Sequence, residues 1–296
     1  MTTEPSAVAE QASGPLATPS EPRIARMFVY PIKSCAGIEV NEAVLTETGL
    51  DLDRAWMLVD EQGEFVSQRE LPRMCLIQPK FRVSDMVLRA PGMLPLHLAL
   101  DAAEQPTKVR VWNDEVAAYD MGAQAAQWFS DFLGTKLRLA RFDPEFQRLS
   151  AMQWTGGVAA PNQFSDGFPL LVLSEAALPG LNERLSAQGQ ASVGIERFRP
   201  NLVLSGLAAH GEDKLTTLQV ETAEGAAELR LVKPCSRCSI PDIDPATAST
   251  GSGVTKALMG YRRDARVNGA ITFGMNAIVA SGADLVLRVG QSVRVT

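Results

Sequence analysis

Residues 231–245 read LVKPCSRCSIPDIDP, and this stretch places Cys235 and Cys238 three positions apart with one arginine between them. The segment before the cysteines, residues 227–232, is typical of a strand, and Pro234 is expected to end it. The sequence therefore predicts that both cysteines lie on a loop at the end of a strand, which is a usual place for reactive groups.

A Cys-x-x-Cys pair is compatible with several kinds of site. The other cysteines and histidines that could bind a metal are Cys35, Cys75, His97 and His210. None of them forms a second close pair, which argues against a structural zinc site. Pro241 and Pro245 would break the helix that a thioredoxin-like redox motif needs. Two alternatives remain: one thiolate that binds a transition metal beside cofactor ligands, or two buried, inert cysteines.

The composition of the chain bounds the classes of function. The 296 residues are 46% hydrophobic and 21% charged, with a net charge of −6, which is ordinary for a soluble protein and argues against a general binder of nucleic acid or anionic membranes. Four cysteines do not make a secreted disulfide scaffold. No apolar run reaches the roughly 18 residues of a membrane span. Residues 1–22 are small, polar and proline-containing, and we expect a disordered tail there.

Strand signals dominate the rest of the chain. Between residues 24 and 112 they recur about every 8–12 residues with turns between them, which predicts a β-barrel or sandwich. Residues 123–133 show helical spacing and end at Gly134. Residues 141–157 are irregular, and a loop is expected there. Further signals predict strands at 170–173, 201–204, 270–278 and 285–295 and a helix at 174–188. The predicted fold class is mostly β, of the α+β type.

Polar side chains in several turns form a second pattern. They are Lys33, Ser34, Arg54, Ser165, Asp166, Arg199 and Asn201. Turns of a barrel can gather at one rim, where two arginines, a lysine and a hydroxyl would form a phosphate clamp. Asparagine and aspartate would suit the edge of a heterocycle. The plain alternative is a set of ordinary surface charges.

Several motifs together resemble a known family. Those that are similar to a MOSC N-terminal β-barrel domain are Tyr30–Gly37, Leu52–Trp56 and Gln68-Arg69. Those that are similar to a MOSC domain are Phe164–Ala176, Phe198–Asn201, Lys233–Cys238 and Ile243–Pro245. Residues 23–296 thus resemble the mitochondrial amidoxime-reducing component and its bacterial YcbX-like relatives. The resemblance implies a tail at residues 1–22, a MOSC N-terminal β-barrel-like domain at 23–145 and a MOSC β-barrel domain at 146–296.

The same resemblance implies a cofactor and the residues around it. The cofactor would be molybdenum cofactor (Mo-molybdopterin), with Cys238 as the catalytic metal ligand. The residues implied to bind its pterin and phosphate are Lys33, Ser34, Arg54, Ser165, Asp166, Arg199 and Asn201. Cys235, Arg237 and Asp244 would lie next to the ligand loop. A contact from Gly167, or from the loop at 146–160, stays open.

The implied activity is the reduction of N-hydroxylated compounds such as amidoximes, hydroxylamines and N-hydroxylated bases, by removal of oxygen at molybdenum. The alternative is a module that carries or sulfurates the cofactor without substrate turnover. A third possibility is a thiol-containing binding protein that is not an enzyme.

Two departures from the family lead to expectations about partners and location. Bacterial relatives often carry a C-terminal [2Fe–2S] domain, whose cysteine spacing is absent here. We therefore expect a separate electron donor, ferredoxin-like or cytochrome-b5-like with a reductase. The polar N-terminal residues stand where the amidoxime-reducing proteins have a targeting segment, so a cytoplasmic protein is expected.

Overall fold

The computed structural model describes residues 21–296, and its largest sheet contains nine strands. Eight follow the order β19-β14-β15-β17-β12-β13-β1-β2, and β16 pairs with β17. Only the β12–β13 pair is parallel. The strands are β1 (Arg23–Val29), β2 (Ile38–Val40), β12 (Leu170–Ser174), β13 (Leu202–Ser205), β14 (Thr217–Glu221), β15 (Ala226–Ser236), β16 (Arg263–Asp264), β17 (Ala270–Ser281) and β19 (Val293–Val295).

Three smaller sheets complete the β structure. Their orders are β5-β11-β10-β9, β6-β7-β8 and β18-β3-β4. The strands are β3 (Glu42–Thr46), β4 (Gly49–Leu50), β5 (Trp56–Val59), β6 (Gln78–Phe81), β7 (Asp85–Arg89), β8 (Leu96–Ala99), β9 (Gln105–Val111), β10 (Asp114–Asp120), β11 (Arg138–Phe142) and β18 (Val286–Arg288). The sheets are open rather than closed barrels, within a mostly β fold as predicted.

The helices are few and short. The α-helices are α1 (Gly122–Leu133), α2 (Met152–Thr155), α3 (Ala177–Ala187) and α4 (Gly253–Met259). The 3-10 helices are η1 (Pro72–Leu76), η2 (Ile195–Phe198), η3 (Gly211–Lys214), η4 (Ile240–Asp242) and η5 (Ala265–Val267). Within residues 21–296, no helix is long and apolar enough to cross a membrane.

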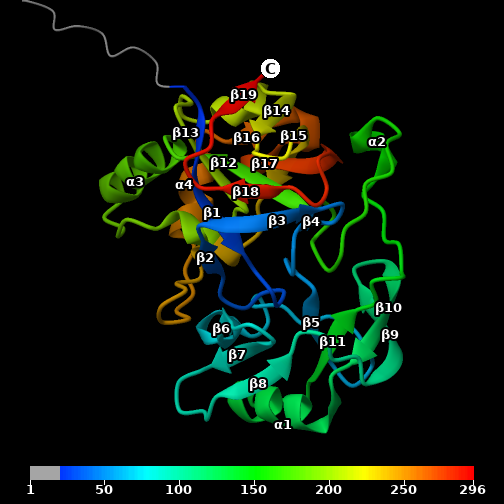
Figure 1. Ribbon diagram of the computed structural model, residues 1–296. Helices are drawn as coiled ribbons and strands as arrows, with labels where there is room; N and C mark the ends of the chain where they lie inside the picture. Colours follow the sequence, from blue (N-terminus) through cyan, green and yellow to red (C-terminus); the bar gives the residue numbers. More distant parts are fainter. Residues whose placement is uncertain (1–20) are drawn as a thin grey trace, which may run out of the picture.

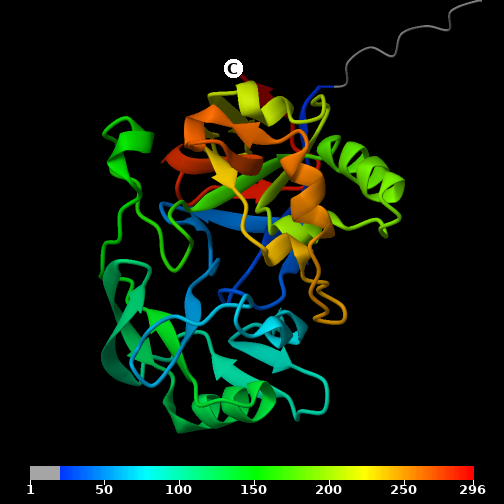
Figure 2. The same ribbon diagram turned by 180° about the vertical axis from the view of Figure 1, so that it is seen from behind.

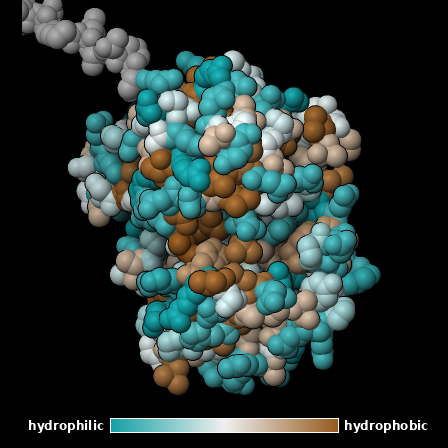
Figure 3. All heavy atoms as spheres, in the orientation of Figure 1, coloured by the Kyte–Doolittle hydropathy of each residue, from teal (hydrophilic) through white to brown (hydrophobic). Residues whose placement is uncertain are grey.

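The sheets form two lobes (Figures 1 and 2). The large lobe contains the nine-stranded sheet, the β18-β3-β4 sheet, α3 and α4, and the small lobe contains the other two sheets and α1. Hydrophobic side chains are visible at the junction of the lobes in the space-filling view (Figure 3). Separate hydrophobic cores fill the lobes, one around Met27 and Leu202 and another around Trp56 and Phe129.

Strand pairing joins the two ends of the described chain. Strand β1 pairs with β13, and β3 pairs with β18, so both opening strands belong to the large lobe. In Figure 1 the blue β3 lies beside the red β18. The domain boundary between residues 145 and 146 stays a prediction. Both of these strand pairs join a strand before that boundary to a strand after it.

The main local error of the sequence analysis concerns the cysteine stretch. Pro234 does not end the strand, because β15 continues to Ser236 and includes Cys235. The pairing of β15 with β14 ends at Arg230, so Pro234 lies where no neighbouring strand on that side needs its missing N–H. Register shifts on both sides of Pro234 interrupt the regular pairing of β15 with β17. Cys238 therefore follows a strand that is longer than expected.

Other segments agree with the prediction or differ from it for simple reasons. The predicted helix is α1, and Gly134 ends it with a φ of 75° in the left-handed region, which glycine adopts without strain. The region 141–157 contains the end of β11 and all of α2 rather than only a loop. Strand β10 was not predicted. It follows β9 after a turn at Trp112, whose φ of 57° the sequence did not indicate.

Glu212 is a buried carboxylic acid outside any predicted site. It lies in η3, is 0% exposed, and neither of its carboxylate oxygens has a hydrogen-bond partner within residues 21–296. Burial raises its pKa from 4.5 to about 7. The folded protein therefore favours the protonated acid.

We expect Glu212→Gln to change how stability depends on pH. Because the folded-state pKa is raised, wild-type stability should be greatest below the unfolded pKa of roughly 4.3 and should fall as pH rises to about 7. The variant should match the wild type near pH 4 and be more stable at pH 8 by about 3–4 kcal/mol. Urea unfolding of both proteins at the two pH values measures this, and a stability difference that does not change with pH contradicts it.

Candidate functional site

A cleft that is partly open to solvent lies where the lobes meet. It brings together all but one of the residues that the sequence predicted for the site. They are Lys33, Ser34, Arg54, Ser165, Asp166, Arg199, Asn201, Cys235, Arg237 and Cys238. Their assignment to a cofactor stays a prediction. Asp244 does not line the cleft, but its carboxylate forms an ion pair of 3.2 Å with Arg197, which does.

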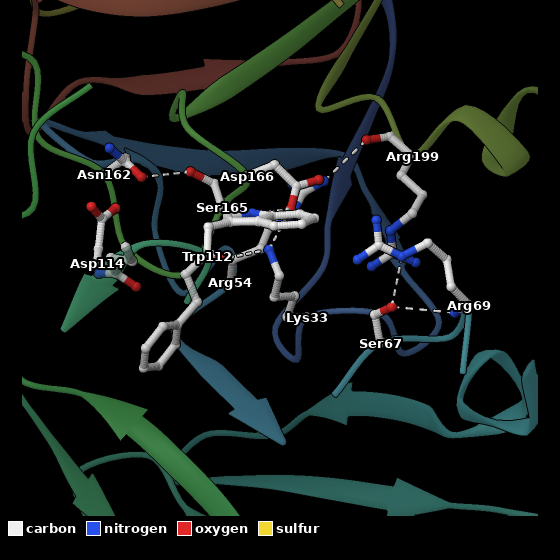
Figure 4. Close-up of polar contacts among 12 residues, drawn as sticks. Lys33, Arg54, Ser67, Arg69, Trp112, Asp114, Asn162, Ser165, Asp166 and Arg199 are labelled. Carbon is white, nitrogen blue, oxygen red and sulfur yellow. Dashed lines mark hydrogen bonds and ion pairs between the residues drawn. The ribbon is translucent and has the colours of Figure 1, made fainter. Parts of the chain in front are cut away.

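Lys33 and Asp166 form an ion pair inside the cleft (Figure 4). The Lys33 Nζ donates hydrogen bonds to Asp166 Oδ1 at 2.6 Å and to the Phe164 carbonyl at 2.7 Å. Burial lowers the pKa of Lys33, and the Asp166 charge opposes this shift. Protein atoms around the Asp166 carboxylate remove part of its hydration and oppose its charge, but Lys33 holds the pKa of Asp166 below its usual range. The Asp166 side chain as a whole is 73% exposed, so solvent screens this attraction.

Arg54 and Arg199 lie against the same aromatic ring. Their guanidinium carbons are 4.4 and 4.3 Å from the centre of the Tyr30 ring. Arg54 also pairs with Asp53 and donates to the Arg199 carbonyl at 3.1 Å. Both arginines have a positive φ, of 54° and 56°, which is uncommon for residues other than glycine and points to constraint by the surrounding fold. The attraction of each guanidinium to the Tyr30 ring offsets part of the repulsion between the two positive charges.

Arg199 retains hydrogen-bonding capacity. Its Nη1 donates to the Cys35 carbonyl at 2.6 Å, whereas its Nη2 is buried without a partner within residues 21–296. Burial and the nearby charge of Arg54 lower its pKa. A buried donor without a partner is costly, and an anion would supply both an acceptor and a countercharge.

Asn201 is mainly engaged with the protein itself. Its Oδ1 accepts hydrogen bonds from Arg54 Nη1 and from the Leu171 amide, both at 3.1 Å, and its Nδ2 donates to the Phe28 carbonyl at 3.2 Å. Asn201 is 1% exposed. It therefore positions Arg54 and links β1 to β12, and little capacity remains for contact with a heterocycle.

The two cysteines differ in their surroundings. Cys238 is exposed at the cleft, whereas Cys235 is partly buried. Burial raises the pKa of the Cys235 thiol. The guanidinium of Arg237 donates to the carbonyls of Phe198 at 2.9 Å and Phe273 at 3.0 Å. These bonds attach the segment to β17 and η2. The more accessible thiol thus stands on a backbone that Arg237 holds in place.

Arg148 supports the site, although no motif in the sequence predicted it. Its side chain is 6% exposed and pairs with Asp114 at 2.8 Å. Its Nη1 donates to Asn162 Oδ1 and to the carbonyls of Gln163 and Ser165, each at 2.7 Å. Arg148 therefore fixes the turn that carries Ser165 and Asp166. A single arginine in an irregular segment carries no pattern that would reveal this role.

The β9–β10 turn supplies another contact that was not predicted. Trp112 Nε1 donates to Asp166 Oδ1 at 3.3 Å, and the Arg69 guanidinium lies 4.9 Å from the centre of the Trp112 ring. Arg69 Nε also donates to Ser67 Oγ at 3.1 Å. The small lobe thus contributes Arg69 and Ser67 to the wall of the cleft, and Trp112 contacts Arg69 and Asp166 beside it (Figure 4).

Two domain families match the chain. Residues 21–136 match the MOSC N-terminal beta barrel domain, and residues 159–294 match the MOSC domain. Mitochondrial amidoxime-reducing component 1 of Mus musculus is 36% identical over 233 residues, which cover 76% of this chain and 66% of that protein. Mitochondrial amidoxime reducing component 2 of Bos taurus is 33% identical over 76% of this chain and 67% of its own length.

A longer protein is similar over nearly the whole chain. Molybdenum cofactor sulfurase of Homo sapiens is 30% identical over 96% of this chain but only 33% of its own length. The chain spans about two thirds of the amidoxime-reducing relatives and about one third of the sulfurase. Both domain matches and these relatives agree, and the chain therefore belongs to the family of two-domain MOSC proteins that includes the mitochondrial amidoxime-reducing components.

Proposed function

We propose that this protein is a molybdenum-cofactor-dependent reductase of N-hydroxylated compounds. The observation that carries the proposal is one exposed thiol, Cys238, in a cleft that also contains Lys33, Arg54 and Arg199. The relatives named as amidoxime-reducing components support the reaction class. Amidoximes, hydroxylamines and N-hydroxylated bases are the proposed substrates.

The residues of the cleft fit a phosphorylated, anionic cofactor. Lys33 uses two of its three N–H groups within the protein, and the Arg199 Nη2 has no partner within residues 21–296. Arg54 is the better satisfied arginine, since Asp53 and Asn201 accept its hydrogen bonds. The remaining N–H groups and the charge of Arg199 suit phosphate oxygens.

When bound, the molybdenum cofactor supplies the two-electron chemistry that cleaves an N–O bond. The chain provides the thiolate of Cys238 as the metal ligand and holds its loop through Arg237. Arg54 and Arg199 offset negative charge in the cleft, and Lys33 keeps a proton on Nζ beside Asp166. A separate ferredoxin-like or cytochrome-b5-like protein, with its reductase, is the proposed electron donor. The cytoplasmic location stays a prediction, since the relatives are named mitochondrial.

A second candidate function is a module that carries or sulfurates the cofactor. The observation that favours it is the similarity to molybdenum cofactor sulfurase across 96% of this chain. The same cleft would hold the cofactor without turning over a substrate.

Molybdenum analysis and benzamidoxime reduction test the two candidates. The protein is produced in a host that makes molybdenum cofactor, its metal content is measured, and reduction to benzamidine is followed with an artificial electron donor. The reductase should contain close to one molybdenum per chain and form benzamidine. Bound molybdenum without benzamidine formation would support the carrier, and protein without molybdenum would contradict both candidates.

A further inference from the structure

A second cavity, which we call the chamber, lies next to the cleft. It is partly open to solvent and shares Arg197, Arg199 and Ile240 with the cleft. Both lobes contribute to its wall, including Tyr30 from the large lobe and Gln68 from the small lobe. Of the residues predicted to bind cofactor, only Arg199 lines the chamber. The two cavities therefore have mostly different lining residues.

Two buried polar groups at the chamber lack hydrogen-bond partners within residues 21–296. Tyr30 is 1% exposed, and its hydroxyl is unpaired. Arg199 Nη2 is the second. The side chain of Gln68, which is 3% exposed, also lines the chamber and can donate through its amide. Buried polar groups are nearly always satisfied in native proteins, so two unpaired donors around one cavity point to a missing acceptor.

The charges around the chamber favour a negative ligand. Arg197 is neutralised by Asp244 at 3.2 Å, but Arg199 has no carboxylate partner within residues 21–296. The Glu196 carboxylate folds back over Gly194, since a Cβ placed on Gly194 would lie 2.1 Å from both of its oxygens. Glu196 is exposed and also has no ion-pair partner within residues 21–296, so solvent screens its charge more than that of the half-buried Arg199.

The rest of the wall is largely apolar. Phe28 and Tyr30 stack with ring centres 6.3 Å apart, and Ile240, Ile243 and Pro245 complete this part of the chamber. A ligand with a flat hydrocarbon body and an acceptor at one end would satisfy both kinds of surface.

We propose that the chamber is a second binding site, separate from the cleft, for a small organic carboxylate with a flat apolar body. Its carboxylate would accept hydrogen bonds from Gln68, Tyr30 and Arg199, and its apolar part would contact Phe28 and Ile243. Because Arg199 lines both cavities, a carboxylate in the chamber would compete with an anion in the cleft for the same charge.

Benzoate binding to the purified chain tests this site, measured by titration calorimetry and by saturation-transfer NMR. Wild type should bind one benzoate saturably and bind benzamide at least about tenfold more weakly, because the neutral amide lacks the charge. Gln68→Leu and Tyr30→Phe should each weaken benzoate binding about tenfold, which corresponds to about 1.4 kcal/mol. Circular dichroism and thermal unfolding check that each variant is folded.

Two control variants separate the chamber from the rest of the surface. Gln127→Leu, on the exposed side of α1, should bind benzoate like the wild type, whereas Cys238→Ser, which should lose the competing anion from the cleft, should bind benzoate at least as tightly as the wild type. The proposal is overturned if wild type shows no saturable binding up to millimolar benzoate, or if Gln68→Leu and Tyr30→Phe both bind as tightly as wild type. It is also overturned if Cys238→Ser alone abolishes binding, since the benzoate would then lie in the cleft.

Discussion

Cys238→Ser is expected to reduce benzamidoxime turnover at least about a thousandfold and to lower the molybdenum content of the purified protein. Serine replaces a soft thiolate by a hydroxyl, which is a poor ligand for a metal held through sulfur. Cys238 is exposed, so unfolding free energy should change by no more than about 0.5 kcal/mol. Metal analysis, turnover with an artificial electron donor and urea unfolding measure the three quantities.

Cys235→Ser is the matched control, because it makes the same chemical change three residues earlier. Cys235 is partly buried, and burial raises its pKa, which disfavours the thiolate. This variant should keep most of its molybdenum and activity. The opposite result, an active Cys238→Ser and an inactive Cys235→Ser, would assign the metal to Cys235 and refute our assignment.

Arg148→Met should destabilise the protein by about 3–5 kcal/mol. The buried guanidinium holds Asn162 and the carbonyls of Gln163 and Ser165, and these acceptors would be left unpaired. Methionine keeps much of the aliphatic volume, so the loss should come from the polar contacts. Urea unfolding followed by fluorescence measures the change in unfolding free energy.

Arg138→Met is the control for this prediction. Arg138 also pairs with an aspartate, Asp120, but its side chain is 46% exposed. Exposed ion pairs contribute no more than about 1 kcal/mol, so this variant should stay close to wild type. Equal losses for Arg138→Met and Arg148→Met would show that the buried network of Arg148 has no special role.

The sequence was most informative where the local structure depends on residues that are close together in the chain. The spacing of Ala126, Phe129 and Leu133 predicted α1, and Gly134 marked its end. Strand signals were recognised between residues 24 and 112, and the short apolar segment 170–173 predicted β12. It failed at Pro234, because whether a proline ends a strand depends on which side of that strand has a neighbour.

The candidate site was predictable as a set of residue types but not as an arrangement. Lys33, Arg54, Arg199 and Cys238 were recognised from their motifs, and all of them line the cleft. Arg148, Trp112 and the chamber around Gln68 were not recognised. Each depends on contacts between residues that are far apart in the chain, and such partners leave no local pattern.

The sequence by itself determined the mostly β class, the positions of many strands, the similarity to MOSC proteins and the identity of several polar groups that line the cleft. Local periodicity and short motifs carry that information. Only the tertiary structure decided that β1 and β3 join strands of the C-terminal half, that Cys238 is the more exposed thiol, and that Asn201 is occupied in positioning Arg54. Burial, strand partners and free hydrogen-bonding capacity arise from contacts across the folded chain, so they exist only once the lobes have assembled.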